Sequence, residues 1–157
     1  MDGSYIDMRE MYDLTLADAD VSLGEDVLEK IISEDVASFC YRNEETLSWM
    51  RELKAKGFKI GILTNMSPSF VAPFKEHFGD FIGLADAMVI SGQERMFKPQ
   101  RRIYDLMSRR LGVEPGEILF IETSLSNCDG ARRAGWKAIR FTSLAEARRA
   151  AGECAVD

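Results

Sequence analysis

The sequence predicts a doubly wound α/β domain built on a parallel sheet, and two observations carry this prediction. After residue 57, short apolar runs alternate four times with amphipathic stretches, as strands and helices do when crossover helices join parallel strands. Three polar motifs lie beyond the ends of these runs. Because ligands bind at the carboxyl edge of such sheets, we expect the functional residues there.

The elements are expected in a regular order. Apolar positions in residues 7–42 are spaced for helices. Asn43 is expected to cap the next helix, which should stop at Gly57. The following elements are then a strand at 58–63, a helix at 70–78, a strand at 87–90, a helix at 100–111, a strand at 118–121, a helix at 127–134, a strand at 137–141 and a last helix from residue 143. The change of character divides the chain into an all-helical front part, 1–42, and an α/β core, 43–157.

Composition and charge limit the partners and the kinds of site that this chain can have. A chain of 157 residues that is 46% hydrophobic has room for one packed domain. The net charge of −6 argues against nucleic acid or an anionic membrane as partner and favours a small ligand or another protein. No apolar run has the roughly 20 residues needed to span a bilayer, and no signal segment is present, so we expect a cytoplasmic protein. Cys40, Cys128 and Cys154 suit neither a disulfide framework nor a zinc site.

Two motifs could hold an anion. Thr64 and Asn65 close the strand at 58–63, so a hydroxyl and the backbone amides after it can face a ligand. Lys98 precedes Pro99, which favours an extended backbone at the lysine and fixes the direction of its side chain. A lysine so directed can neutralise a phosphate or pair with buried carboxylates. Taken singly, each motif is more often an ordinary turn or surface loop.

A third motif places a carboxylate at the tip of a strand. Glu122 ends the run at 118–121, and a helix is expected to open near Asn127. Oxygen ligands of this kind suit hard cations such as Mg²⁺. Residues 127–139 form the most specific stretch of the sequence.

Together, these motifs resemble those of the haloacid dehalogenase (HAD) superfamily, in particular its phosphatase-like members with a small helical cap. The matching residues are Leu63-Thr64-Asn65, Phe97-Lys98-Pro99 with Ile103-Tyr104, and Glu122-Thr123 with Asn127 and Gly130-Ala131. The resemblance implies a HAD-like Rossmannoid sheet, a hydrolase and a small phosphorylated metabolite as substrate. It identifies residues 1–42 as a partial helical cap. It also implies that Thr64 and Asn65 bind the phosphoryl group, that Lys98 is catalytic and holds that group, and that Glu122 and Asn127 stand near Mg²⁺.

The chain departs from the family pattern in two places. The family's first motif is a strand ending in Asp-x-Asp, whose first carboxylate is the nucleophile. No apolar strand precedes Met1-Asp2-Gly3-Ser4, so we expect the nucleophile to be absent from this chain. The second acidic position of the fourth motif is Thr123, whose neutral hydroxyl is a poorer ligand for Mg²⁺ than a carboxylate. This substitution weakens the metal site that the resemblance implies.

Two structural hypotheses follow from these departures. Lys98, without its aspartate partners, is expected to pair with Glu122 in place of the metal. The family's first strand lies at the centre of the sheet, so its loss would expose the edges of two neighbours. We expect another segment, a second copy of the chain or a strand-complementing chain to fill the gap, unless the chain is a fragment of a longer protein.

Two functions remain open. The first is a HAD-like phosphatase, of which this chain keeps the phosphate-holding side without the attacking side and is itself inactive. The second is a non-catalytic HAD-like binding or regulatory protein. Thr123 favours the second, because a truncation at the front would not explain a substitution more than a hundred residues later.

Overall fold

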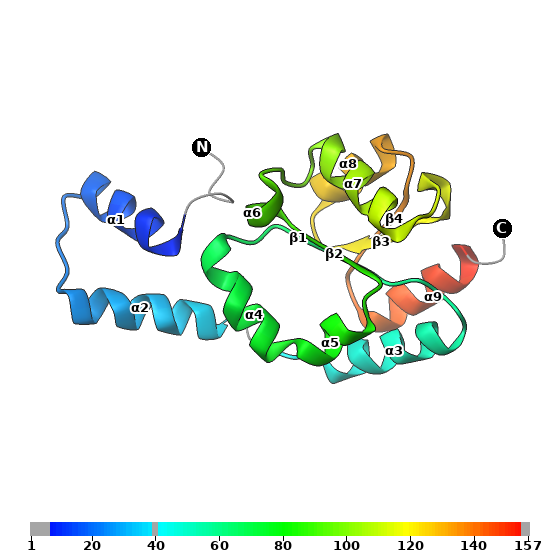
Figure 1. Cartoon of the computed structure of the whole chain (residues 1–157), viewed down its shortest axis with the longest axis horizontal. Coiled ribbons are helices and arrows are strands. Elements are labelled where there is room, and N and C mark those ends of the chain that lie inside the picture. Colours follow the sequence, from blue (N-terminus) through cyan, green and yellow to red (C-terminus); the bar gives the residue numbers. More distant parts are fainter. Residues whose placement is uncertain (1–6, 39–40, 155–157) are drawn as a thin grey trace.

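The computed structural model describes residues 7–38 and 41–154, where helices pack around short parallel strands (Figure 1). The strands are β1 (Gly61–Thr64), β2 (Ala87–Ile90), β3 (Leu119–Glu122) and β4 (Lys137–Arg140). The helices are α1 (Met8–Asp18), α2 (Glu25–Ser38), α3 (Glu44–Ala55), α4 (Val71–His77), α5 (Gly79–Leu84), α6 (Ser91–Glu94), α7 (Arg101–Leu111), α8 (Leu125–Arg133) and α9 (Leu144–Cys154). The α/β class predicted from the sequence is confirmed.

The sheet consists of two halves. β1 pairs in parallel with β2, starting with Gly61 opposite Ala87, and β3 pairs in parallel with β4, starting with Leu119 opposite Lys137. Among the described residues, no strand joins β1 to β3. The interruption falls where the sequence analysis expects a central strand to be lacking.

A cavity of about 620 Å³ lies between the two halves, and we call it the slot. Its long walls are residues 61 and 63 of β1 and residues 118–121 at β3. α7 contributes Met107 to one face, together with Trp136, while α3 and α9 contribute Trp49 and Ala151 to the other. In Figure 1, α7 and α8 accordingly lie on one side of the strands, and α3 and α9 on the opposite side.

The hydrophobic core lies beneath α7 and α8. Tyr104 and Trp136 are buried there and meet edge to face, with ring centroids 5.1 Å apart. Phe120 of β3 packs against both rings, at 6.0 and 5.6 Å. The indole N–H of Trp136 donates to the Ser108 hydroxyl at 3.0 Å, so the polar atom of this ring is satisfied within the core.

Two element boundaries differ from the prediction for local reasons. β1 begins at Gly61 and not at residue 58, because the backbone of Ile60 is held by the loop before β2. The Asp86 carboxylate accepts from the Ile60 N–H at 2.7 Å, and the Ile60 carbonyl accepts from the Asp86 N–H, also at 2.7 Å. α8 begins two residues before Asn127, because the Ser124 side chain caps it by accepting from the Asn127 N–H. The short helices α5 and α6 were not predicted.

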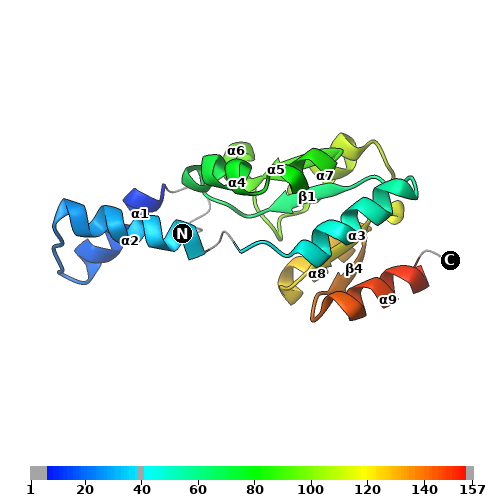
Figure 2. The same cartoon turned by 90° about the horizontal axis from the view of Figure 1, so that it is seen from below.

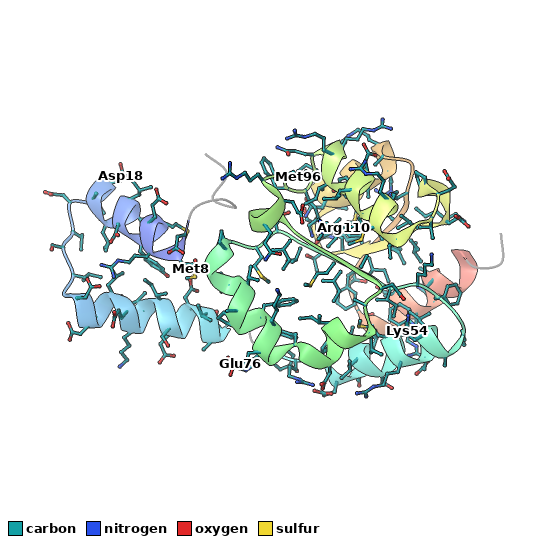
Figure 3. The ribbon with its side chains drawn as sticks, viewed as in Figure 1. Met8, Asp18, Lys54, Glu76, Met96 and Arg110 are labelled. Carbon is teal, nitrogen blue, oxygen red and sulfur yellow. The ribbon has the colours of Figure 1, made fainter. Side chains whose placement is uncertain are left out.

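α1 and α2 form a hairpin that projects from the rest of the molecule (Figure 2). Tyr12 of α1 donates to the Asp35 carboxylate of α2 at 3.1 Å. The hairpin meets the core at Met8, whose N–H donates to the Ser69 hydroxyl at 2.9 Å, while Asp18 lies at the far end of α1 (Figure 3).

Asn43 caps α3, as predicted, by accepting from the Thr46 N–H. The division at residues 42 and 43 stays a prediction.

We predict that Gly130→Ala destabilises the protein, because α8 approaches the loop at Pro99 too closely for a side chain. A Cβ at this position would stand 2.7 Å from Pro99 Cβ and 2.8 Å from the Tyr104 hydroxyl. Overpacking of this kind costs about 2 kcal/mol, which urea denaturation would measure. The control is Gly152→Ala in α9, where a Cβ meets nothing within 4 Å. If both variants retain the wild-type free energy of unfolding, the prediction that α8 packs too closely on this loop for a side chain is wrong.

Candidate functional site

The candidate site lies at the carboxyl ends of β1 and β3, where Lys98 bridges the two halves of the sheet. The Lys98 ammonium donates to the Leu63 carbonyl in β1 at 3.1 Å and to the Glu122 carboxylate at the end of β3 at 2.6 Å. The pairing of Lys98 with Glu122 predicted from the sequence is therefore present. Both side chains are largely buried, with 9% of Lys98 and 11% of Glu122 exposed.

Asn65 holds the backbone of Lys98 in place. Its side-chain oxygen accepts from the Lys98 N–H at 2.9 Å, and its amide nitrogen donates to the Lys98 carbonyl at 3.0 Å. These two bonds fix the loop ahead of the cis peptide bond that joins Lys98 to Pro99. The sequence analysis places Asn65 beside a bound phosphoryl group. In the structure its amide is occupied by Lys98, so Asn65 positions the lysine.

Phe120 adds a further contact to the lysine. The Lys98 ammonium lies 5.5 Å from the centroid of the Phe120 ring, within the range of a cation–π interaction. An ammonium has three N–H donors, and Leu63 and Glu122 take two of them. One donor direction of Lys98 therefore remains for a ligand or for the ring.

The Glu122 carboxylate is saturated with donors. One oxygen accepts from the Thr123 N–H at 2.8 Å, the Thr123 hydroxyl at 3.1 Å and the Ser124 N–H at 3.1 Å. The other accepts from Lys98 and from the Asn127 side-chain amide at 3.2 Å. Burial alone would raise the pKa of Glu122, but the bonds from Lys98, Ser124 and Asn127 outweigh it and lower the pKa below its usual value. Glu122 is therefore ionised at neutral pH.

The other predicted site residues, Thr64 and Asn127, lie at the ends of elements that contact this pair. Thr64 is the last residue of β1 and follows the carbonyl that Lys98 contacts. Asn127 lies in the first turn of α8, where its carbonyl accepts from the Tyr104 hydroxyl at 2.8 Å. Ser124 and Phe120 contact the pair and were missed by the sequence analysis. The spacing of Ser124 before α8 was a recognisable capping signal, whereas the contact of Phe120 with Lys98 depends on tertiary packing.

The residues at this edge do not fit Mg²⁺. That ion requires several oxygen ligands in near-octahedral geometry. Glu122 is the carboxylate that the resemblance assigns to the metal, and its oxygens are already used by five donors. In residues 7–38 and 41–154, no cluster of three or more His, Cys, Asp or Glu side chains could hold a metal ion. Thr123 bonds to Glu122 through its hydroxyl and does not add a carboxylate.

Two further residues with titratable side chains, Cys128 and His77, lie outside the contacts of the ion pair. Cys128 is buried and unoxidised, with its thiol directed at the carbonyls of Glu122 and Ile139. Burial raises the pKa of this thiol. His77 is exposed in the last turn of α4, and its carbonyl accepts from Arg42 at 3.0 Å. Cys40 lies outside the described residues.

Comparison with known proteins agrees with this geometry. Residues 2–135 match the family of haloacid dehalogenase-like hydrolases. The chain belongs to this family. It is 33% identical over 87 residues to (S)-2-haloacid dehalogenase of Pseudomonas sp. (strain YL), covering 55% of this chain and 37% of the relative. It is 32% identical over 91 residues to phosphoglycolate phosphatase of Escherichia coli (strain K12), covering 57% of this chain and 35% of the relative.

Solved structures of HAD enzymes share the fold. L-2-haloacid dehalogenase of Xanthobacter autotrophicus superposes with a TM-score of 0.61 at 25% identity, over 87% of this chain and 54% of that one. A mutant HAD family enzyme of Bacteroides thetaiotaomicron, in complex with magnesium and inorganic phosphate, gives a TM-score of 0.68 at 17% identity. The superposition covers 90% of this chain and 73% of that one. This chain spans between about a third and about half of the curated HAD relatives that it matches. None of the described helices is long and apolar enough to cross a membrane.

We predict that Glu122→Gln lowers the free energy of unfolding by about 3 kcal/mol at pH 7, because it leaves the Lys98 charge buried without its partner. The pKa of Glu122 is lowered in the folded state, so its stabilising effect is present above the pKa of the unfolded chain, near 4.3, and is lost as pH falls through the folded value. Urea denaturation between pH 3 and 7 should therefore show a steeper acid loss in the wild type than in the variant.

The control for this variant is Glu52→Gln, which breaks the exposed pair of Glu52 with Arg148. These side chains are 44% and 41% exposed, so the change should stay within about 0.5 kcal/mol. Equal effects of the two substitutions would contradict a special role for the buried pair.

Proposed function

We propose that this chain is the phosphoryl-holding part of a HAD-like hydrolase for a small phosphorylated metabolite, and that it does not complete hydrolysis by itself. One observation carries the proposal: a largely buried lysine is fixed at the carboxyl edge by bonds of 3.1 and 2.6 Å to β1 and β3. A cation so oriented, one residue away from Thr64 along β1, can bind an anionic group where ligands bind in this class of sheet.

The proposed roles follow from the groups that remain available. The third N–H of Lys98 is directed to the anion, and the Thr64 hydroxyl donates a second bond. Asn65 is a positioning residue, since its amide is bonded to the Lys98 backbone. Glu122 keeps Lys98 oriented but reduces its net charge at the site, so the affinity for an isolated phosphate should be modest.

The missing part in this proposal is the attacking carboxylate. In the described parts of the chain, the strands end in Thr64, Ile90, Glu122 and Arg140, and none ends in aspartate. Glu122 is held by five donors and paired with Lys98, which makes it a poor nucleophile. The proposal assigns Mg²⁺ no role through Glu122 and Asn127, whose oxygen donors do not fit the ion. A cytoplasmic location stays a prediction from the sequence.

A second candidate function is a non-catalytic HAD-like protein that binds an anion or another protein. Thr123 favours it, because this residue replaces an acidic family position and uses its hydroxyl to hold Glu122 at 3.1 Å. The Lys98–Glu122 pair then serves as a permanent structural element. Relatives named as dehalogenases add 2-haloacids to the substrates worth testing.

We predict that the purified chain hydrolyses para-nitrophenyl phosphate at the rate of buffer, with or without Mg²⁺, because in residues 7–38 and 41–154 no strand ends in an aspartate that could attack phosphorus. Release of halide from 2-chloropropionate should also stay at background. Phosphate and halide release are measured directly, and calorimetry tests Mg²⁺ binding. Turnover that depends on Mg²⁺, or micromolar affinity for the ion, would overturn the proposed absence of catalysis.

We predict that inorganic phosphate binds with a dissociation constant of roughly millimolar order and that Thr64→Val weakens it about fivefold, as expected for one lost hydrogen bond. Two-dimensional NMR titration of the backbone amides measures both affinities. Thr15→Val is the control, because Thr15 is an exposed residue of α1 whose hydroxyl donates to the Met11 carbonyl. Equal phosphate affinity in the Thr64 variant and the wild type would show that the Thr64 hydroxyl does not bind the phosphate.

A further inference from the structure

Ser91 is a buried polar residue next to the candidate site. It directly follows β2, as Asn65 follows β1, and the two strands end opposite each other at Thr64 and Ile90. The exposed fraction of Ser91 is 0%. A hydroxyl buried to this degree is costly unless it is hydrogen-bonded, so its partners show what it holds.

The Ser91 hydroxyl holds the backbone of a single residue, Met66, by both of its polar groups. It accepts from the Met66 N–H at 2.9 Å and donates to the Met66 carbonyl at 3.2 Å. The Gly92 N–H donates to the same carbonyl at 3.1 Å. Met66 belongs to the segment that follows β1, yet three hydrogen bonds attach it to the end of β2.

The approach of this segment to Gly92 is too close for any side chain. A Cβ on Gly92 would stand 2.7 Å from the Met66 carbonyl oxygen and 2.9 Å from Pro68 Cδ. A carbon atom cannot come so near without displacing the segment, so glycine is required here. Ser91 and Gly92 together are therefore shaped to receive the Met66 peptide unit.

A second clamp joins the same two segments farther along the chain. The Asn65 side chain is bonded to the N–H and the carbonyl of Lys98, at 2.9 and 3.0 Å. The segment after β1 thus holds Lys98 and is itself held at Met66 by Ser91. Since Asn65 and Met66 are adjacent, a shift of Met66 would move Asn65 and, with it, the backbone of the lysine.

We propose that Ser91 is a positioning residue for the anion site, because it fixes the segment from which Asn65 grips Lys98. Ser91 touches no ligand in this role. It keeps the Asn65 amide opposite the Lys98 backbone, and this determines where the ammonium stands between β1 and β3. The positioning of the lysine is argued from these bonds alone, whereas its effect on anion binding rests on the proposed function.

The test compares Ser91→Ala with a matched control, Ser108→Ala. Ser108 is the other buried serine in the described parts of the chain, with 8% of its surface exposed. Its hydroxyl also makes two hydrogen bonds, accepting from the Trp136 indole and donating to the Tyr104 carbonyl. Both substitutions therefore remove a buried hydroxyl with two bonds, but only the first removes it from the clamp.

Hydrogen exchange of the Lys98 amide, followed by two-dimensional NMR, reports the clamp because this N–H is bonded to Asn65. Ser91→Ala should speed its exchange about tenfold more than that of the β4 amides, as expected for two lost hydrogen bonds. Ser108→Ala should not single out Lys98. In NMR titrations with inorganic phosphate, Ser91→Ala should weaken binding about threefold, and Ser108→Ala should keep the wild-type affinity.

If Ser91→Ala does not fold, Gly92→Ala gives the same test from the other side of the contact, because its Cβ would push the Met66 carbonyl away. The proposal is overturned if exchange rises equally at Lys98 and in β4, or if the Ser91 variant binds phosphate as the wild type does. A wild type that binds no phosphate would instead contradict the proposed function. The exchange at Lys98 would then decide by itself whether Ser91 positions the lysine.

Discussion

The ion pair of Lys98 with Glu122 is the contact on which the arrangement of this protein depends. It joins two halves of a sheet that no strand connects within the described residues. Removing two charges from water is costly, and a buried pair is tolerated only when its remaining donors and acceptors are also bonded. Here Glu122 has five donors, and Asn65 fixes the backbone of Lys98. The pair and its surroundings therefore form a single unit.

The same pair determines which ligands the edge can accept. A hard dication needs carboxylates with oxygen atoms to spare, and Glu122 has none. A fully compensated lysine would also attract anions weakly, but Lys98 keeps one donor direction that Leu63 and Glu122 do not take. The edge is therefore suited to orienting an anionic group more than to binding it tightly. In a HAD-like hydrolase, that is the task of the residues that hold the substrate while another carboxylate attacks.

Much of this could be predicted from the sequence, because the signals were local. The alternation of strands and helices and the cap at Asn43 followed from residue type and order, whereas the pairing of Lys98 with Glu122 was expected from the departures from the family pattern. The start of β1 could not be predicted, since it depends on a bond between Ile60 and Asp86 across 26 positions. The clamp of Asn65 on the lysine backbone was missed for the same reason. Helices as short as α6 have too few residues to show a period.

The position of the open edges has a consequence for assembly. A strand that adds to the outside of a sheet covers one edge and creates a new one, so such addition can continue from chain to chain into a fibre. Within the described residues, the inner edges of β1 and β3 have no partner strand and face each other across the slot instead. A strand that entered there would cover both at once and leave no further template. Addition at this place is therefore self-terminating at one strand per chain.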